Sequence, residues 1–590
     1  MSDSPREPGA PDWTPPDKPS VTLASSALDA MSKNERIKVE SNGLFFVGAD
    51  GSARHAFAEE VDALTRGERP TIGNEAKELS KFFGIYRQQE RGERGRKSGD
   101  QIFMVRIKCP AGGELTARQW GALDDAADAY ADGTLRITSR QGVQYHHVYG
   151  PKLAPLVRGL NRGYREEATL GACGDVNRNV MTSPVDGLLG PGDARARELA
   201  QAIATDLAPR SSSYFQVFLS DAEGRSLAPL NADEPIYGPQ YLPRKFKVGL
   251  AHPDDNSIDL RTQDVGLLPV DADGARWDLW SGGGLGQTHN NAATAPLLGL
   301  YLGRIPRAQV VDAVRAIALL QKEHGERKDR KLARWKYTIR RLGIGTVRRA
   351  LRDRFGIALE DAEPMPLPPG RVHLGWHEAA DGSGFYGISV ENGRLRPEAR
   401  KGVRAAVESL GLRVRMTPHQ DLLLVGVRDR GALLRVLDGH GVPRPETVSR
   451  VRQLAIACPA LPTCGLAMTH AERALPGYID AIDAAGLGDV DVEIRMTGCP
   501  NHCARPPSAE IGIFGYGKND HVILVGGSRN GMRIGKVLYE RISEEQMIPA
   551  LVGLLRAIKT RAPAGIAVGD WLFEAEPAAL RGWIGVEGAA

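Results

Sequence analysis

Two stretches of the chain repeat the same order of apolar and polar positions. In the first, residues 103–109 alternate as FMVRIKC, which predicts a strand with Arg106 and Lys108 on the same face. A helical pattern follows at residues 115–131, and a second strand is expected around residues 135–148, which read LRITSRQGVQYHHV. The pattern therefore predicts a strand, helix, strand unit.

The same order returns at residues 384–427 as a strand, a Gly turn, a helix and a strand. We align residues 135–144 with residues 413–422 and interpret the two stretches as an internal repeat. The proline-dense residues 363–370 separate the copies and form the best linker candidate. Two related halves are therefore expected to face each other, with a large cofactor between them.

The region before the first repeat has a different pattern. Residues 1–20 are polar and proline-rich and lack the apolar core that a secretory signal needs, so we expect a disordered tail. Residues 54–98 look helical and charged, and residues 90–100 (ERGERGRKSGD) predict an exposed loop.

Composition narrows the class of protein. A chain of 590 residues is too long for one hydrophobic core, so several domains are expected. No stretch reaches the roughly 18 uninterrupted apolar residues of a membrane span, which favours a soluble protein. A net charge of +4 over 76 basic and 72 acidic residues is too dispersed to indicate nucleic-acid binding by itself.

Four of the six cysteines form the most specific motif. Cys458 and Cys464 are spaced C-x5-C, and 34 residues later Cys499 and Cys503 are spaced C-x3-C. Structural zinc sites usually have shorter spacings such as C-x2-C, and disulfides are rare in a reducing compartment. Both alternatives are therefore less favoured than an iron–sulfur cluster with four thiolate ligands.

The residues around the motif indicate how the cluster would be stabilised. The sequence after Cys464 looks helical, and Pro500 suits the first position of a helix after Cys499. We therefore expect both thiolates near helix amino termini, whose positive dipole ends favour an anionic cluster. The other two cysteines, Cys109 and Cys173, are interpreted as buried packing residues.

Basic residues recur within motif-like segments rather than as surface runs. They are Arg106, Lys108, Arg140, Arg178, Arg244, Lys245 and Lys247. Beside an iron–sulfur motif, several fixed cations would attract an anionic substrate and stabilise charge as its bonds break. Arginine binds oxyanions through paired hydrogen bonds, and a buried lysine can serve as a proton source.

Two further segments have several interpretations. The basic run Glu326–Gly343 has three interpretations: a nucleic-acid patch, a solvated amphipathic helix, or a binding surface for the carboxylates of a cofactor. The Gly-rich segment Trp280–Gln287 is not a GxGxxG at a strand-to-helix junction, so it does not support NAD or FAD binding.

At this point the motifs resemble those of the sirohaem and 4Fe-4S sulfite and nitrite reductase family. The resemblance is carried by ACPALPTCGLAM and RMTGCPNHCARP around the cysteines, and by KFFGIYRQ, TSRQGVQYH, YLPRKFK and DRKLARWKYTIRRLG. It implies an α+β (mixed α/β) fold, in which a pseudo-twofold repeat of ferredoxin-like units combines with two sirohaem- and cluster-binding domains. The implied boundaries are a tail at 1–53, ferredoxin-like halves at 54–160 and 363–445, and cofactor-binding domains at 161–362 and 446–590.

The resemblance also implies roles for individual residues. The cluster ligands would be Cys458, Cys464, Cys499 and Cys503, the last of which would also bridge to the sirohaem iron. The cations around the substrate would be Arg106, Arg178, Lys245 and Lys247. The residues lining the sirohaem and its carboxylates would be Arg140, Gln144, His146, Arg244, Thr497 and Asn501. Two further neighbours near the site, and candidates for a covalent cross-link, would be Tyr86 and Cys173.

The implied function is assimilatory sulfite reduction, the six-electron conversion of sulfite to sulfide. Because the chain has no flavin or nicotinamide motif, electrons would come from another protein, either ferredoxin or a NADPH-dependent flavoprotein. Ferredoxin-dependent nitrite reduction is the main alternative, and CPALPTCGLA around the first two cysteines favours sulfite. An iron–sulfur regulator that binds nucleic acid through Glu326–Gly343 is a remote alternative. We expect a cytoplasmic enzyme without a membrane partner.

Overall fold

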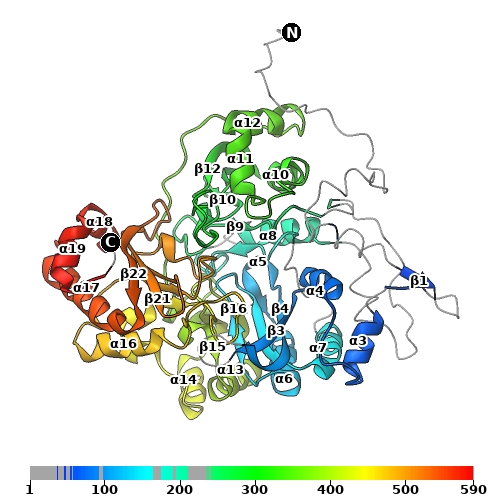
Figure 1. Ribbon diagram of the computed structural model, residues 1–590, viewed down its shortest axis with the longest axis horizontal. Coiled ribbons are helices and arrows are strands. Elements are labelled where there is room, and N and C mark those ends of the chain that lie inside the picture. Colours follow the sequence, from blue (N-terminus) through cyan, green and yellow to red (C-terminus); the bar gives the residue numbers. More distant parts are fainter. Residues whose placement is uncertain are drawn as a thin grey trace, which may run out of the picture.

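The computed structural model describes residues 58–91, 97–163, 175–190, 195–209 and 241–588, together with short segments at 36, 45–47, 53–55 and 236–237. Within these ranges the strands form four five-stranded sheets and a small ladder of β1 (Phe45–Val47) with β2 (Ala53–His55). The mixed α/β fold expected from the sequence is confirmed (Figure 1).

The first two sheets exchange a strand with each other. One has the order β15 (Arg394–Leu395), β6 (Leu135–Ile137), β7 (Val143–Val148), β4 (Lys97–Ile107) and β3 (Ile85–Arg91). The other has the order β13 (Gly375–Glu378), β14 (Gly384–Ile388), β17 (Leu422–Val427), β16 (Arg413–Met416) and β5 (Glu114–Leu115). Each sheet thus takes its short edge strand from the other half of the chain, as a pseudo-twofold repeat requires.

Matching helices cover these two sheets. They are α6 (Ala117–Tyr130) and α7 (Gly150–Gly163) in the first half, and α13 (Pro397–Leu410) and α14 (Arg430–Gly439) in the second. α6 begins where Thr116 and Gln119 form a capping box, and α13 begins with a proline at its first position. Both helices bury an apolar face in the same core, which includes Trp120 and Val403.

The other two sheets also repeat one topology. The third contains β8 (Met181–Thr182), β9 (Val248–Leu250), β10 (Val265–Pro269), β11 (Arg276–Ser281) and β12 (Leu300–Pro306). The fourth contains β18 (Ala455–Ala457), β19 (Ile494–Thr497), β20 (Ile511–Gly515), β21 (Asp520–Val525) and β22 (Lys536–Ser543). In each sheet the first three strands are parallel and the last two are antiparallel.

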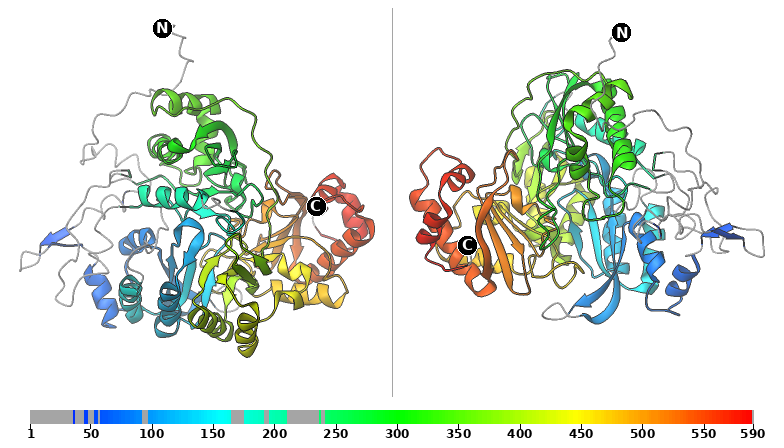
Figure 2. Two further views of the ribbon diagram at one scale, coloured as in Figure 1. Left: turned by 180° about the vertical axis from the view of Figure 1, so that it is seen from behind. Right: turned by 45° about the horizontal axis from the view of Figure 1, so that its top comes forward.

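The remaining helices lie around these sheets, in corresponding places in the two halves. The third sheet is accompanied by α8 (Arg195–Asp206), α10 (Val310–His324), α11 (Trp335–Leu342) and α12 (Ile344–Asp353). The fourth is accompanied by α15 (Arg450–Gln453), α16 (Leu475–Ala484), α17 (Met547–Arg561), α18 (Val568–Glu574) and α19 (Pro577–Ile584). Both views in Figure 2 place α17 to α19, in red, far from the green α10 to α12.

The turn between the paired strands shows the repeat residue by residue. Across the first turn the Thr138 N–H donates to the Gly142 carbonyl, and the Gly142 N–H donates to the Thr138 hydroxyl. Thr417 and Asp421 make the same two hydrogen bonds across the second turn. The structure therefore aligns residue 138 with residue 417, which is one residue away from the alignment predicted from the sequence. The predicted single strand at 135–148 is a hairpin, because this turn separates β6 from β7.

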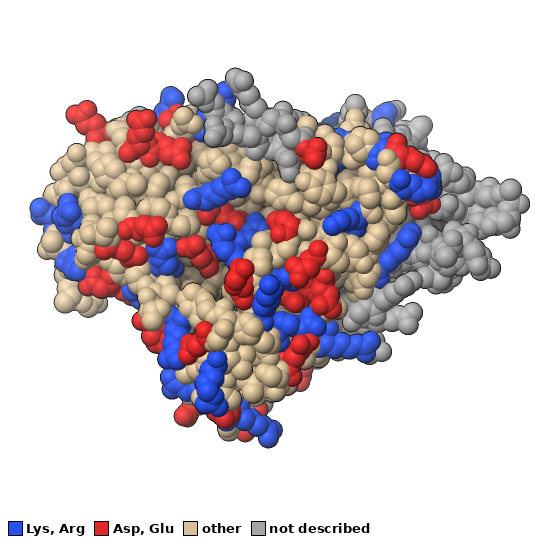
Figure 3. Space-filling model, turned by 90° about the horizontal axis from the view of Figure 1, so that it is seen from below, with Lys and Arg blue, Asp and Glu red and all other residues tan. Residues whose placement is uncertain are grey.

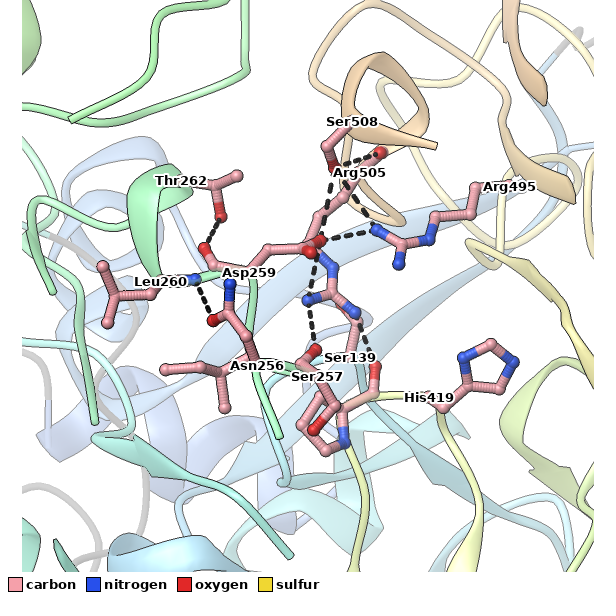
Figure 4. Close-up of polar contacts among 12 residues, drawn as sticks. Ser139, Asn256, Ser257, Asp259, Leu260, Thr262, His419, Arg495, Arg505 and Ser508 are labelled. Atoms are coloured by element: carbon pink, nitrogen blue, oxygen red, sulfur yellow. Dashed lines mark hydrogen bonds and ion pairs between the residues drawn. The ribbon is translucent and has the colours of Figure 1, made fainter. Parts of the chain in front are cut away.

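An ion pair joins equivalent positions of the two halves (Figure 4). Asp259 and Arg505 each have a positive φ, of 48° and 62°, and each precedes a short 3-10 helix, η3 (Leu260–Thr262) or η7 (Pro506–Ser508). The Asp259 carboxylate binds Arg505 at 3.1 Å and Arg495 of β19 at 2.5 Å, and all three side chains are buried. The interface between the halves is therefore charged at its centre.

The amino-terminal region differs from the prediction in one element. The helical pattern at 54–98 contains α3 (Ala58–Thr65) and α4 (Asn74–Ser80), but its end forms the strand β3. The prediction of helix there is wrong because Ile85 is fully buried and the segment pairs antiparallel with β4 from Ile85 opposite Val105. β4 ends at Ile107, so Lys108 lies just beyond the strand.

The helices of the described residues are short or polar relative to what a bilayer requires. Within that part of the chain, no helix combines the length and the apolar character needed to cross a membrane.

Candidate active site

The four motif cysteines follow the ends of two neighbouring parallel strands. β18 ends immediately before Cys458, and β19 ends two residues before Cys499. The backbone N–H of Gly498 donates a hydrogen bond to the Cys458 sulfur at 3.4 Å, which joins the two loops. The side chain of Asn501 donates to the Cys499 sulfur at 3.5 Å. The loops therefore meet at one edge of the fourth sheet.

The four thiols are close enough to oppose one another's ionisation. Burial raises the pKa of the Cys458 thiol, and the neighbouring Cys503, Cys499 and Cys464 raise it further. Burial also raises the pKa of Cys499 to about 12, again with a contribution from Cys503. Four thiolates in this place would need a positively charged centre between them.

A single metal ion would require a tighter arrangement. Zinc–sulfur bonds are about 2.3 Å long, so the ligands of one zinc ion converge on one point. Across the described ranges, no three His, Cys, Asp or Glu side chains are placed to hold one metal ion. An iron–sulfur cluster is instead held by thiolates that each bind a different iron atom, so its ligands lie further apart.

The predicted helices after Cys464 and Cys499 are wrong. Before α16, the backbone N–H groups bond to other loops, as Met468 does to the Gly498 carbonyl at 2.8 Å. After Cys499 the chain turns through His502 with a φ of 53°, which a right-handed helix does not allow. Hydrogen bonds between loops thus replace the helical pattern that the sequence suggests.

The loop geometry requires glycine at position 498. A Cβ atom there would lie 2.5 Å from the carbonyl oxygen of Thr469 and 2.7 Å from the side chain of Ala460. The same close approach lets the Gly498 carbonyl accept hydrogen bonds from Met468 and Thr469. The loops that carry the four cysteines are therefore packed backbone against backbone.

Arg106 lies among the residues expected from the sequence. Its guanidinium is 5.8 Å from the ring centre of Tyr86. With the Gln144 amide oriented so that its oxygen faces Arg106, the oxygen accepts hydrogen bonds from Nε at 2.9 Å and from the terminal nitrogen. β4 and β7 place Arg106 and Gln144 opposite each other. Tyr86 was expected beside Cys173, which lies outside the described residues.

A second group of cations comes from the loop before β9 and from the turn before β7. Burial and the nearby Lys247, Arg244 and Arg178 hold the pKa of Lys245 well below its usual value. Burial, Arg140 and Arg334 lower the pKa of Lys247 in the same way, while Asp264 and Cys503 oppose the shift. The influence of Cys503 on Lys247 shows that the cations adjoin the cysteine loops.

Arg140, in the turn before β7, is fixed by hydrogen bonds to residues near β8 and β10. It donates to the side-chain oxygen of Gln263 at 2.7 Å and to the Asn179 carbonyl at 2.5 Å. Burial and the charge of Arg178 lower the pKa of Arg140 to about 9. Another cation of the group, Arg244, lies 4.0 Å from the Asp175 carboxylate. Burial and the charge of Arg330 lower the pKa of Arg244 to about 10. The structure thus gathers the expected cations into one region.

The remaining expected residues come from β7 and from the end of β19. His146 is buried on β7, and its Nδ1 accepts a hydrogen bond from Arg394 at 3.0 Å. Thr497 is buried at the end of β19, and its hydroxyl donates to the Cys499 carbonyl at 3.1 Å. Ser139, beside Arg140, donates to the Cys503 carbonyl at 2.9 Å. Cys109 is buried beyond β4, in agreement with its interpretation as a packing residue.

Two supporting residues were missed in the sequence. The Asn179 amide donates to the carbonyls of Cys109, Arg140 and Gln141 and so fixes the turn that presents Arg140. Lys336 of α11 is fully buried and donates to the carbonyls of Gly284, Gly286 and Ala295. Lys336 lies within the basic run Glu326–Gly343, so its contacts bear on the interpretation of that run.

That basic run turns inward. Arg334 binds the Asp264 carboxylate at 3.1 Å, and Arg340 donates to the Gly282 carbonyl at 2.9 Å. The Gly-rich loop held in this way lies against the cysteine loop, because Gln287 N–H donates to the Pro500 carbonyl at 2.9 Å. These inward contacts weigh against a nucleic-acid patch in this run. On the face seen from below in Figure 3, acidic and basic side chains are intermixed, as the small net charge of +4 leads one to expect.

Comparisons with known proteins identify the family. A model described as the nitrite and sulphite reductase 4Fe-4S domain matches residues 173–359, and one described as the nitrite/sulfite reductase ferredoxin-like half domain matches residues 94–163 and 377–433. The sulfite reductase (NADPH) hemoprotein beta-component of Staphylococcus saprophyticus is 34% identical, covering 93% of this chain and 96% of that protein. The chain belongs to the nitrite and sulfite reductase family.

Other members of the family are equally similar. The sulfite reductase (NADPH) hemoprotein beta-component of Chromohalobacter salexigens is 37% identical over 93% of this chain and 96% of that protein. The sulfite reductase (ferredoxin) of Synechococcus elongatus is 35% identical over 93% and 90%. The solved structure of the Mycobacterium tuberculosis NirA protein has the same fold, with a TM-score of 0.73, 23% identity, and coverage of 89% of this chain and 95% of that one.

The site fits the cofactors of this nitrite and sulfite reductase family. Several buried polar atoms have no hydrogen-bond partner among the described residues, namely Nε of Arg140, both amide atoms of Asn177 and both ring nitrogens of His502. The neighbouring cations depress one another's pKa, and the nearby Asp264 offsets only part of that shift for Arg140 and Lys247. A carboxylate-rich sirohaem would supply further negative charge, and a 4Fe-4S cluster would supply the positive centre that the four thiolates need.

Proposed function

We propose that the chain is the haemoprotein of an assimilatory sulfite reductase, which converts sulfite to sulfide. The observation that carries the proposal is the hydrogen bond from the hydroxyl of Ser139, the neighbour of Arg140, to the Cys503 carbonyl at 2.9 Å, because it brings a cysteine loop and a cationic pocket together. Sirohaem and the 4Fe-4S cluster, when bound, supply electron transfer and an open coordination position for the substrate.

The proposed cluster ligands are Cys458, Cys464, Cys499 and Cys503. Their loops are held together by the Gly498–Cys458 hydrogen bond and by the bonds from Met468 and Thr469. Cys503 is the proposed bridge to the sirohaem, because it is the exposed one of the four thiols and the family resemblance gives it this role. Its carbonyl is fixed by Ser139 from the opposite half of the molecule.

The proposed substrate-binding cations are Arg106, Arg178, Lys245 and Lys247. Sulfite carries two negative charges, and its reduction consumes six protons with six electrons and releases three molecules of water. Fixed cations attract the anion and stabilise charge on each oxygen as the sulfur–oxygen bond breaks. Lys245 and Lys247 have lowered pKa values, so they can give a proton to a leaving oxygen and recover it from water.

The proposed sirohaem contacts are Arg140, Gln144, His146, Arg244, Thr497 and Asn501. Arg140 and Arg244 would pair with carboxylates of the macrocycle. His146 accepts from Arg394 at Nδ1, and a guanidinium can only donate, so the ring proton lies on Nε2. Burial and Arg394 keep the pKa of His146 well below its usual value, so the ring is a neutral donor.

The electron donor is a separate protein in this proposal. Relatives named as NADPH and as ferredoxin enzymes are similarly close to this chain, so either a flavoprotein subunit or ferredoxin fits. We propose a cytoplasmic location, because a cluster held by four thiolates is compatible with a reducing compartment.

The test is reduction of sulfite by purified, cofactor-loaded protein. With a reduced dye as donor, we expect sulfide to form and kcat/KM for sulfite to exceed that for nitrite. Faster turnover of nitrite would reverse the substrate order, and purified protein with zinc or without a tetrapyrrole spectrum would refute the proposal. Supplying reduced ferredoxin in one reaction and a NADPH-dependent flavoprotein in another would then identify the donor.

A further inference from the structure

One carboxylate connects the cysteine loops to the opposite half of the molecule. Glu472 lies in the segment between Cys464 and α16, and its side chain is only 15% exposed. One carboxylate oxygen accepts from Arg136 at 2.9 Å, and the other accepts from Arg394 at 2.7 Å. The backbone of Glu472 is also engaged: its N–H donates to the Cys458 carbonyl at 3.1 Å, and its carbonyl accepts from the Asn392 amide at 3.0 Å.

The two arginines also bind other groups, Arg136 at the cysteine loop and Arg394 on β7. Arg136, which is fully buried on β6, also donates to the Ala457 carbonyl at 2.8 Å, in the residue before Cys458. Arg394 on β15 donates to Nδ1 of His146 on β7. Glu472 therefore holds the Cys458 carbonyl through its own N–H and the Ala457 carbonyl through Arg136. Through Arg394 it is also linked to His146 on β7.

The other half of the molecule contains a matching arrangement without cysteines. Arg415 on β16 is the repeat equivalent of Arg136 on β6. It binds the Glu114 carboxylate at 2.5 Å and donates to the carbonyls of Pro184 and Asp186 at 2.9 and 2.8 Å. Glu114 also pairs with Arg197 at 3.0 Å. Both halves thus use a buried arginine and a carboxylate to fasten a loop onto a sheet, and only one of the loops leads to a proposed ligand.

We propose that Glu472 is a positioning residue, which holds the ligand loop of Cys458 at a fixed place relative to the His146 strand and so sets the separation of the two cofactors. The proposal rests on the proposed function, since it takes Cys458 as a cluster ligand. A charge-assisted pair is suited to this role because each hydrogen bond has a fixed direction and the Arg136 guanidinium forms an ion pair with no other carboxylate of the described residues.

The test compares Glu472→Gln with Glu114→Gln, the matched change at the arginine–carboxylate pair that does not contact the loops of the four motif cysteines. The first measurement is amide hydrogen exchange of the apoprotein at residues 455–475. We expect exchange there to become at least about tenfold faster in Glu472→Gln, equivalent to about 1.4 kcal/mol, and to be unchanged in Glu114→Gln. The second measurement is the midpoint potential and the electron paramagnetic resonance spectrum of the reduced cluster, which we expect to change only in Glu472→Gln.

Each outcome distinguishes the two proposals. Wild-type protein without a 4Fe-4S cluster would overturn the proposed function. Wild-type protein with the cluster, combined with unchanged exchange and an unchanged potential in Glu472→Gln, would overturn the positioning role alone. If Glu472→Gln does not fold, Glu472→Asp keeps the charge and shortens the reach; exchange and potential identical to wild type in that variant would equally refute the role.

Discussion

The Asp259 pair at the centre of the interface gives a stability prediction with a worked magnitude. Asp259→Asn keeps the size of the side chain and removes its charge. Arg495 keeps a second carboxylate, Glu493, at 3.0 Å, whereas Arg505 keeps only the carbonyls of Ser257 and Pro418. The loss is therefore close to that of one buried ion pair, and we expect the free energy of unfolding to fall by about 3–5 kcal/mol.

The assay is denaturant unfolding of the apoprotein followed by circular dichroism, with Asp271→Asn as control. Asp271 pairs with Arg276 at the surface, where an ion pair contributes about 0–1 kcal/mol, so this variant should unfold close to wild type. Burial lowers the pKa of Arg505 to about 10 while Asp259 opposes that shift, so removal of the carboxylate leaves a buried guanidinium without this compensation. A loss in Asp259→Asn no larger than in the control would refute the reasoning that the interface depends on this charge.

Two further changes test the pocket and the repeat. Lys247→Met should lower kcat/KM for sulfite by about 10²–10³-fold in the dye assay, because one buried donor to the anion is lost. The control Lys331→Met changes an exposed lysine and should leave kcat/KM unchanged. A wild-type kcat/KM in Lys247→Met would contradict the proposed role of Lys247 in binding the anion. Burial raises the pKa of Asp421 to about 8, far above an unfolded carboxyl, so the folded state binds the extra proton and its stability falls as the pH rises from about 4 to 8. Asp421→Asn, compared with wild type by thermal unfolding, should gain stability steadily over that range, and a pH-independent difference would contradict the buried neutral carboxyl.

The sequence predicted the elements that follow from periodicity and missed those that depend on tertiary contacts. α6 and α13 appear where the helical pattern places them, because both patterns combine an apolar face with a clear start. β3 was missed, because its charged pattern makes sense only when it pairs with β4. The segment after Cys464 has good helical residues, yet its backbone bonds to the Gly498 loop, and no local pattern encodes that contact.

The candidate site could be predicted to the level of residue types but not of connections. The spacing of the cysteines and the motif-like placing of Lys245 and Lys247 were visible in the sequence, and the structure brings these groups together. The anchoring role of Lys336 was hidden within a basic run, because burial of a lysine by three carbonyls leaves no mark on composition.

The two halves share a backbone turn but differ at the side chains that would face a cofactor. The first half has Arg140, Gln144 and His146, and the repeat places His419, Leu423 and Val425 at the corresponding positions of the second. Leu423 and Val425 are buried in an apolar cluster with Phe385, Val185 and Leu188, so that face is already filled. Because an apolar, closed surface cannot compensate the carboxylates of a sirohaem, the proposed charged pocket lies against the first sheet and not at the corresponding positions Leu423 and Val425 of the second. The asymmetry of these side chains, rather than the repeated backbone, thus decides where the chemistry takes place.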